Sequence, residues 1–429
     1  MLYYILFYIG YIIKNISSLT HLESFNVGDN YITHTIPIEL TYLTKLTYLN
    51  LQSNMLTSTI PYNISNLLLL QYIYINDNYL TGNIHTIFNN FTNLLELSIS
   101  ENYITGSVFM EPLHLPVLEY LSLQSNYITS TISIEYSKLN NLLYLSIYNN
   151  YLTGSIPSEL GNLTLLWYFG LQNNYLTNTI PSTLGQLNEI EGIFLNNNYL
   201  TGNLPEELSY CSNLYALILD NNDFTGSLPV EFRNFHSLRY FSIVNNKISN
   251  TLPSSLWNLH HLLHFVVSNN YITGTLSLSI INAKVLTSLN VSNNYMYGSI
   301  PSILGQLHTL QVISLSGNYF TGSLPPAVSA LTHLYDLDIS RNALTGPLTH
   351  VFNASKQTRL STVVLGNNSF TGPLPDALFH LHSIVSVSIF STCLTGTLPE
   401  SVCSSGSTLQ YLTLNGLHTA ASCRRTVWS

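Results

Sequence analysis

Asparagine recurs at a constant spacing of 24 residues through most of the 429-residue chain. The series begins at Asn30, runs without a slip to Asn342, and meets Asn368 after 26 further residues. Such a period predicts one short structural unit repeated about 17 times, with imperfect first and last copies. Because units this short cannot bury their own apolar side chains, we predict a single solenoid whose neighbouring coils bury them.

Each unit follows the pattern L-x-x-L-x-L-x-x-N-x-L-T-G-x-I-P-x-x-L-x-x-L. Around Leu46, Leu49 and Leu51 the apolar residues alternate with others, which predicts a short β-strand with its leucines turned inward. The asparagine ends this strand, where its amide can pair backbone groups that the turn leaves open. We therefore predict a structural ladder formed by Asn54, Asn78, Asn102, Asn126, Asn150, Asn174, Asn198, Asn222, Asn246, Asn270, Asn294, Asn318 and Asn342.

The second half of the unit predicts another extended segment. Glycine fills the fourth position after the asparagine in 11 of 16 units, and a threonine follows wherever glycine is missing. The residues that replace glycine are His34, Ser58, Ser130, Asn178 and Asn250. Since histidine and serine fit poorly in left-handed backbone, we predict a short second strand on the flank rather than an obligatory left-handed turn. Proline then stops this strand and turns the chain toward the other side.

Composition and motifs argue against several classes of function. Charged residues make up only 8% of the chain and no basic cluster is present, so phosphate binding to nucleic acid is not expected. No H-E-x-x-H, G-x-S-x-G or phosphate-loop motif occurs. His236, His260 and His308 share one repeat position, but threonine fills it in other units. We predict no metal, no cofactor and no enzyme activity, and keep an enzyme or metal-binding protein as a remote alternative.

The stretches "LTGSIP" (Leu152 to Pro157), "LTGNLP" (Leu200 to Pro205) and "FTGSLP" (Phe320 to Pro325) resemble the plant-type leucine-rich repeat. This resemblance implies an α/β-type leucine-rich-repeat superhelix with a parallel sheet on its concave face, a short flank strand, and a 3-10 or irregular convex side. It also implies the roles of that class: ectodomains of receptor-like kinases, receptor-like proteins, and secreted inhibitors of cell-wall-degrading enzymes. No kinase motif and no cysteine-paired N-terminal cap is present, so a membrane tether or kinase would lie outside this chain.

The two ends of the chain depart from the repeat. Residues 1–15 are either a partial first repeat, with Gly10 in the glycine position, or the remnant of a signal or anchor. Residues 16–417 form the predicted solenoid, and residues 418–429 a C-terminal cap remnant or truncation. Cys393, Cys403 and Cys423 crowd this end, and their pairing cannot be chosen from sequence; Cys403 with Cys423 is the pair we favour. Cys211 is predicted to be an unpaired repeat residue.

One sequence feature favours an extracellular or cell-surface location. Asn-x-Ser/Thr sequons favour a secretory route, although some arise by chance in a chain this rich in Asn, Ser and Thr. The candidate glycosylation sites are Asn15, Asn63, Asn90, Asn162, Asn290, Asn353 and Asn367.

Aromatic residues gather at the variable positions of the predicted concave strands. Rigid amphipathic rings on an exposed sheet suit a recognition surface, although tyrosine is also simply a favoured strand residue. The candidate partner-binding residues are Tyr48, Tyr72, Tyr74, Tyr120, Tyr144, Trp167, Tyr168, Phe194, Tyr240 and His264. Acidic residues accompany them in the first half of the chain, where we favour a solvated face and keep a cationic or amine-rich partner as the alternative.

A second tyrosine series follows the ladder asparagine in 10 of the 14 units in perfect phase, as at Tyr151. We interpret it first as stacked reinforcement of the flank and second as a binding surface. The sequence thus predicts a non-catalytic, receptor-like module that binds a protein, peptide or glycan, with a co-receptor as a further candidate partner. The alternative is a secreted inhibitor of a cell-wall-degrading hydrolase.

Overall fold

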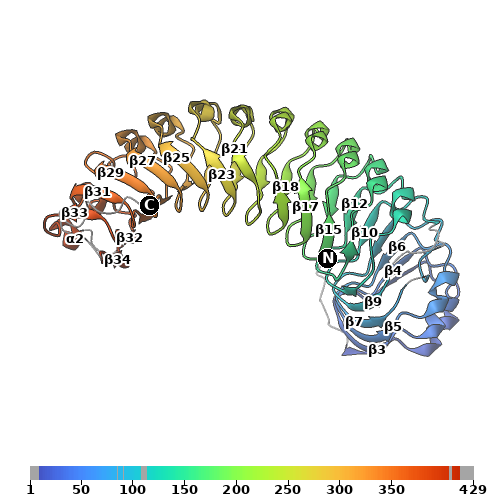
Figure 1. Ribbon diagram of the computed structural model, residues 1–429. Helices are drawn as coiled ribbons and strands as arrows, with labels where there is room; N and C mark the ends of the chain where they lie inside the picture. The colour runs from blue at the N-terminus through green and yellow to red at the C-terminus, as the bar shows by residue number, and fades with distance from the viewer. Residues whose placement is uncertain (1–8, 85, 90, 108–113, 405–407, 416–429) are drawn as a thin grey trace. The chain divides into compact units, whose positions relative to one another are not determined.

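The computed structural model describes residues 9–84, 86–89, 91–107, 114–404 and 408–415. The chain divides into two compact units, which we call the N-terminal unit (residues 1–214) and the C-terminal unit (residues 215–429). Both units are stacks of the same coil. Within each unit the three-residue main strands lie on the inner side of the stack and the 3-10 turns on the outer side (Figure 1).

The main strands of each unit form a parallel sheet in which sequence neighbours pair. In the N-terminal unit they are β2 (Ser24–Asn26), β4 (Tyr48–Asn50), β6 (Tyr72–Tyr74), β8 (Glu96–Ser98), β10 (Tyr120–Ser122), β12 (Tyr144–Ser146), β14 (Tyr168–Gly170) and β16 (Gly192–Phe194). In the C-terminal unit they are β18 (Ala216–Ile218), β20 (Tyr240–Ser242), β22 (His264–Val266), β24 (Ser288–Asn290), β26 (Val312–Ser314), β28 (Asp336–Asp338), β30 (Thr362–Val364), β32 (Ser386–Ser388) and β34 (Tyr411–Thr413).

The register of these strands keeps like positions together. Leu97, Leu121 and Leu145 pair in sequence across β8, β10 and β12, and all three side chains are completely buried. Their neighbours Tyr120 and Tyr144 point to the other face, because side chains alternate along a strand. Burial of one leucine per strand on the core side thus fixes which residues reach the open face.

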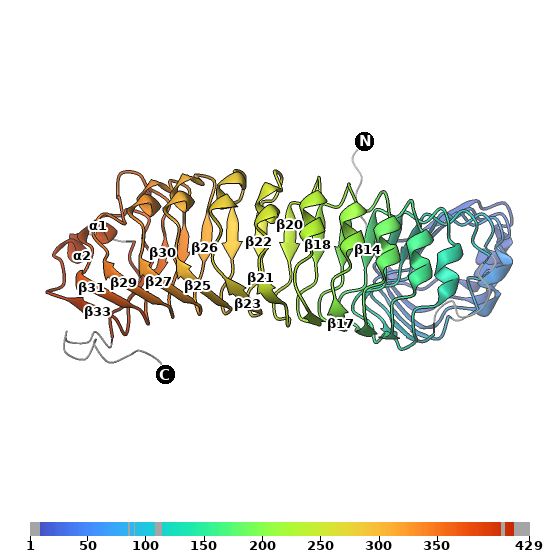
Figure 2. The ribbon, with the colours of Figure 1, turned by 45° about the horizontal axis from the view of Figure 1, so that its top comes forward.

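Flank strands run along one edge of the main strands (Figure 2). In the N-terminal unit they are β1 (Ile9–Gly10), β3 (Tyr31–Thr35), β5 (Met55–Thr59), β7 (Tyr79–Gly82), β9 (Tyr103–Gly106), β11 (Tyr127–Ile128), β13 (Thr153–Gly154), β15 (Tyr175–Asn178) and β17 (Tyr199–Asn203). In the C-terminal unit they are β19 (Asp223–Thr225), β21 (Ser249–Thr251), β23 (Tyr271–Gly274), β25 (Tyr295–Ser299), β27 (Tyr319–Ser323), β29 (Ala343–Pro347), β31 (Ser369–Pro373) and β33 (Cys393–Thr395).

Five-residue 3-10 turns complete most coils. They are η1 (Lys14–Ser18), η2 (Ile38–Tyr42), η3 (Tyr62–Asn66), η4 (Ile134–Lys138), η5 (Ser158–Asn162), η6 (Ser182–Gln186) and η7 (Glu206–Tyr210), then η8 (Val230–Asn234), η9 (Ser254–Asn258), η10 (Leu278–Asn282), η11 (Ser302–Gln306) and η12 (Pro326–Ala330). Two short α-helices, α1 (Asp376–Phe379) and α2 (Ser401–Ser404), take this place near the C-terminal end. The predicted fold class, with its flank strand and 3-10 convex side, is confirmed.

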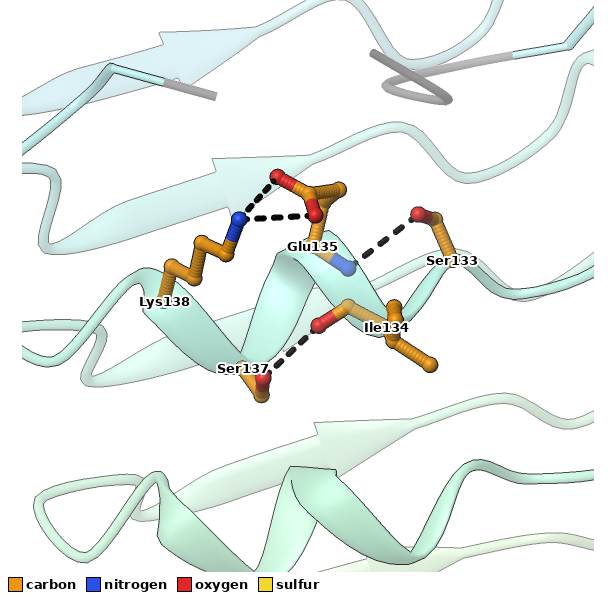
Figure 3. A network of polar contacts seen from close by, with 5 residues as sticks. All are labelled: Ser133, Ile134, Glu135, Ser137 and Lys138. Atoms are coloured by element: carbon orange, nitrogen blue, oxygen red, sulfur yellow. Dashed lines mark hydrogen bonds and ion pairs between the residues drawn. The ribbon is translucent and has the colours of Figure 1, made fainter. Parts of the chain in front are cut away.

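The repeat proline explains where most of these turns begin. It occupies the residue before η5, η6 and η11 with φ between −63° and −71°, close to the value that its ring imposes. In η4 a serine takes its place, and the Ser133 Oγ accepts a hydrogen bond from the Glu135 backbone N–H at 3.1 Å (Figure 3). Lys138 pairs with the Glu135 carboxylate at 2.8 Å on the exposed side of the same turn. In η4 and η10 a serine cap therefore replaces proline.

The prediction that the glycine position is not an obligatory left-handed turn holds only at Ser130. His34, Ser58, Asn178 and Asn250 are left-handed, with φ values of 71°, 71°, 66° and 64°, slightly below the 77° to 97° of the glycines that fill the same position elsewhere. Ser130 is the exception, and flank strand β11 ends before it at Ile128. The position is therefore left-handed although it belongs to a paired strand. Asparagine, histidine and serine can occupy it because left-handed backbone causes them less steric conflict than it causes β-branched residues.

Where another residue replaces the glycine, the threonine that follows it faces the next coil. A Cβ atom on Gly202 would lie 2.6 Å from Thr179 Cγ2, and one on Gly274 would lie 2.7 Å from Thr251 Cγ2. The threonine methyl group therefore leaves little room for a side chain in the following coil, and glycine follows it at Gly82, Gly154, Gly202, Gly274 and Gly298. Ser58, which follows Thr35, is an exception, so this packing accounts for part of the correlation found in the sequence.

Candidate functional site

The asparagine ladder fixes the edge of the main sheet. The Asn150 Nδ2 donates to the Leu123 carbonyl of the preceding coil and to the Ile147 carbonyl of its own coil, both at 3.1 Å. Its Oδ1 accepts from the Ile128 backbone N–H at 3.1 Å. The same bonds recur at Asn78, Asn102 and Asn126, for example. These buried side chains hold neighbouring coils together.

Five aromatic residues of the N-terminal unit gather on the open face of β10 to β16, and we call them the sheet cluster: Tyr120, Tyr144, Trp167, Tyr168 and Phe194. The Tyr120 and Tyr144 rings stack with centroids 4.2 Å apart and planes 7° apart. Tyr144 and Tyr168 stack at 4.5 Å and 11°. Strand register sets this geometry, because the three tyrosines pair directly across β10, β12 and β14.

The two outer members extend the sheet cluster. Phe194 lies 5.2 Å from Tyr168 between ring centroids, and Trp167 lies 5.5 Å from Tyr144. Trp167 is 42% exposed, whereas the other four members are half-buried. The cluster therefore offers a continuous aromatic surface with one ring standing out toward solvent.

Two glycines make room for these rings. A Cβ atom on Gly170 would lie 2.7 Å from the Tyr168 ring, and one on Gly192 would lie 2.6 Å from the Phe194 ring. The rings fold over the space that a side chain would otherwise fill. Sequence reasoning did not assign a role to either glycine, because the conflict depends on ring orientation.

Burial raises the pKa of two phenols of the sheet cluster, Tyr168 and Tyr120. It raises the pKa of Tyr168 to about 12, partly opposed by a hydrogen bond with Gln172. Burial, followed by the neighbouring Tyr144 hydroxyl, also raises the pKa of Tyr120 well above its usual range. At neutral pH these side chains act as hydrogen-bonding and stacking groups and carry no charge.

A second group of candidate residues lies earlier on the same sheet. Tyr48 lies 5.9 Å from Tyr72 and 5.8 Å from Tyr74 between ring centroids. The Tyr74 hydroxyl donates a hydrogen bond to the Glu96 carboxylate, and burial together with this bond raises the pKa of Tyr74. This group therefore pairs aromatic rings with an anion.

The last two candidates belong to the C-terminal unit. Tyr240 and His264 stack at 4.9 Å, and burial lowers the pKa of His264. Tyr215, which the sequence analysis did not select, lies 5.1 Å from Tyr240, and the Arg239 guanidinium lies 5.3 Å from the Tyr215 ring. The repeat frame places Tyr215 and Arg239 in one position, which is the signal that could have found them.

A groove of about 730 Å³ lies beside the main sheet of the N-terminal unit, and we call it the tyrosine groove. One wall is the tyrosine series Tyr79, Tyr103, Tyr127, Tyr151 and Tyr175, whose neighbouring ring centroids are 5.6–6.0 Å apart. The other wall is formed by Asp77, Glu101, Ser125, Asn149 and Asn173. From the sequence, these tyrosines are interpreted first as reinforcement of the flank. The groove can be recognised only when the positions of both walls in space are known.

Comparisons with known proteins agree with the coil geometry. The family model described as Leucine Rich Repeat matches residues 45–67, 141–163, 213–235, 237–259, 285–307 and 309–331. The chain is a leucine-rich-repeat protein. No curated protein matches its sequence significantly.

This leucine-rich-repeat protein is structurally similar to plant receptor ectodomains. The Arabidopsis receptor kinase HAESA, solved with the peptide hormone IDA and the co-receptor SERK1, is 28% identical with a TM-score of 0.78, covering 95% of this chain and 72% of HAESA's. The plant peptide hormone receptor RGFR1, solved with RGF2, is 27% identical with a TM-score of 0.73, covering 96% and 77%. A leucine-rich-repeat protein of Leptospira interrogans is 25% identical with a TM-score of 0.68, covering 94% and 92%. The fold is therefore shared beyond plant receptors.

The cysteines of this leucine-rich-repeat protein differ from the sequence prediction. Cys403 is an exposed free thiol on α2, so it does not form the favoured disulfide with Cys423, while Cys393 on β33 is disulfide-bonded. Proximity in sequence could not decide this, because it does not give the distance between the cysteines in space. Cys423 lies outside the described residues. Cys211 is a buried free thiol.

The sequons differ in their exposure. Asn15, Asn162 and Asn367 are exposed, and Asn63, Asn290 and Asn353 are half-buried. Asn90 lies outside the described residues. The Asn290 Oδ1 on β24 accepts hydrogen bonds from the Ser292 backbone N–H and hydroxyl, at 3.0 and 2.7 Å.

The residues that the structure describes contain neither a membrane-spanning helix nor a cluster of metal ligands. There, no helix is long and apolar enough to cross a membrane. Across the same residues, no three His, Cys, Asp or Glu side chains come together as metal ligands would.

Proposed function

We propose that this leucine-rich-repeat protein is a non-catalytic recognition module that binds a peptide or an extended protein segment on the main-sheet face of its N-terminal unit. The observation that carries the proposal is the sheet cluster, in which Tyr120, Tyr144 and Tyr168 stack at 4.2 and 4.5 Å beside the exposed Trp167. Because stacking already fixes these rings, they lose little side-chain entropy when a ligand binds, and each ring buries a large area.

Among protein, peptide and glycan ligands, the similar structures favour a peptide ligand. HAESA and RGFR1 were both solved with peptide hormones. An extracellular or cell-surface location, and a co-receptor partner, belong to the same proposal, since HAESA is a receptor ectodomain solved with a co-receptor. The exposed sequons Asn15, Asn162 and Asn367 are its candidate glycosylation sites.

The sheet cluster is tested by peptide selection and substitution. The purified chain is immobilised, peptides are selected from a phage-displayed library, and the dissociation constant of the best peptide is measured. In the variant Tyr120→Ala/Tyr144→Ala/Tyr168→Ala we expect binding to weaken by at least about tenfold, as for central aromatic residues of interfaces. The single variant Tyr144→Leu, which keeps an apolar side chain, is measured beside it to guard against misfolding.

The matched control is Tyr271→Ala/Tyr295→Ala/Tyr319→Ala, which removes three exposed tyrosines of the C-terminal unit. We expect it to change the dissociation constant by less than about twofold, because exposed residues outside an interface contribute little. If both triple variants bound the peptide like the unchanged protein, the sheet cluster would not be the site.

A further inference from the structure

The tyrosine groove differs in charge from one end to the other. At one end Asp77 and Glu101 are exposed and stand on neighbouring coils. Toward the other end the same position is neutral: Asn149 Nδ2 donates to Ser125 Oγ at 3.3 Å, and Asn173 Nδ2 donates to Asn149 Oδ1 at 2.5 Å. The groove therefore has an anionic end and an amide end along one tyrosine wall.

The anionic end has no internal counter-charge. Within the described residues, neither the Asp77 nor the Glu101 carboxylate forms an ion pair with a basic side chain. The whole N-terminal unit holds fourteen acidic residues against three lysines and no arginine. Asp77 and Glu101 occupy the same bend in neighbouring coils, and like charges so placed repel. A bound cation would relieve this repulsion.

The backbone holds both carboxylates at the rim. Asp77 and Glu101 have φ values of 55° and 54°, and their backbone N–H groups donate to Ser100 and Gln124 carbonyls at 2.9 Å. Their side chains are therefore attached to fixed backbone, two residues before Tyr79 and Tyr103 in each coil. A planar cation lying between the carboxylates would face these two rings.

The length of the groove fits a short extended chain. Tyr79 and Tyr175 are four coils apart, and steps of 5.6–6.0 Å between neighbouring ring centroids make this distance roughly 20–25 Å. An extended peptide rises about 3.3 Å per residue, so roughly six residues cover this length. Such a peptide also offers backbone carbonyl and N–H groups to the exposed amides of Asn149 and Asn173.

We propose that the tyrosine groove binds an extended peptide segment of about six residues whose terminal arginine lies over Asp77, Glu101, Tyr79 and Tyr103. The guanidinium group matches this end because it pairs with carboxylates through a planar fork and stacks on aromatic faces. Charge complementarity selects a cationic peptide over a neutral glycan, which would gain nothing from the two carboxylates. The site is separate from the sheet cluster and extends the proposed function to a second surface.

Binding is tested with acetylated and amidated hexapeptides. One set carries arginine at the first position, a second carries it at the last, and the remaining positions are random; matching sets carry citrulline, the neutral isostere. Each set is fluorescently labelled and its retention on the immobilised full chain is measured at about 0.05 M salt, where exposed charges are weakly screened. We expect one arginine set to be retained at least fivefold better than its citrulline counterpart.

Two double variants locate this binding. Asp77→Asn/Glu101→Gln removes the carboxylates and is expected to abolish the difference between arginine and citrulline. Glu159→Gln/Glu206→Gln removes the same charge from exposed positions on η5 and η7 and is expected to preserve it. Tyr120→Ala/Tyr144→Ala/Tyr168→Ala is also expected to preserve it, so a failure of this site and a failure of the sheet cluster are told apart.

Three results would overturn the proposal. The first is equal retention of arginine and citrulline sets by the unchanged protein. The second is an equal loss in the groove variant and the η5/η7 variant, which would indicate general attraction by the acidic unit. The third is displacement of the retained arginine peptides by a neutral glucose hexasaccharide, which would assign the groove to a glycan.

Discussion

The side chain of Asn150 joins two coils through hydrogen bonds to four backbone groups. It donates to the carbonyls of Leu123, Ile147 and Tyr148 and accepts from the Ile128 backbone N–H. Only an amide supplies donor and acceptor at this spacing, which is why one residue type recurs while the residues before it vary. The side chain of the neighbouring Asn149 is exposed and bonds to the side chains of Ser125 and Asn173 at the surface.

Replacing this amide should destabilise the protein. We expect Asn150→Ala to lower the free energy of unfolding by about 2–4 kcal/mol, because buried backbone groups in two coils lose their partner. As a matched control, Asn149→Gly should change it by less than about 1 kcal/mol, since glycine accepts the left-handed backbone at that residue. Urea denaturation followed by circular dichroism measures both; equal effects would mean that the ladder amide has no special role.

At the scale of the strand, neighbouring coils constrain one another through the flank. Gly202 and Gly322 have the same φ of 77°. A Cβ on Gly202 would meet Thr179 Cγ2 at 2.6 Å, whereas one on Gly322 would lie 3.6 Å from Ser299 Cβ. The two positions therefore share a backbone cost and differ in the side chain below them.

This pair gives a prediction at the same scale. We expect Gly322→Ala to cost about 1–2 kcal/mol for the left-handed backbone, and Gly202→Ala to cost about 1 kcal/mol more because the threonine must move. Thr179→Ser in the Gly202→Ala protein should recover that excess. Thermal and urea unfolding of the three variants measure the free energy of unfolding. Identical losses of this free energy for the two glycines would contradict the proposed contact with Thr179.

The strands could be predicted from sequence because the period fixes register without knowledge of the fold. Leu121 and Tyr120 alternate in the sequence, and the structure places one inside and the other outside. The left-handed conformation of His34 could not be predicted, since it depends on hydrogen bonds from the next coil. The tyrosine groove was missed because its walls come from different positions of the repeat, and a linear pattern carries no distance between them.

At the scale of the whole molecule, charge is distributed unevenly over a uniform scaffold. The N-terminal unit is strongly acidic, while the C-terminal unit holds nine basic and seven acidic residues. Coil geometry barely changes between the units, so they differ mainly in the side chains they present. Recognition in a repeat protein of this kind is set by those variable positions, and both proposed surfaces lie in the acidic unit.

The most direct test of this account is photo-crosslinking from a single residue of the sheet cluster. Tyr144 is replaced by benzoylphenylalanine, the full chain is irradiated with the selected peptide, and the product is measured by mass spectrometry. The same substitution at Tyr271, an exposed tyrosine on β23 of the C-terminal unit, is the control. The account predicts an adduct from position 144 and none from position 271. An adduct from 271 alone would place recognition away from the sheet cluster and contradict it.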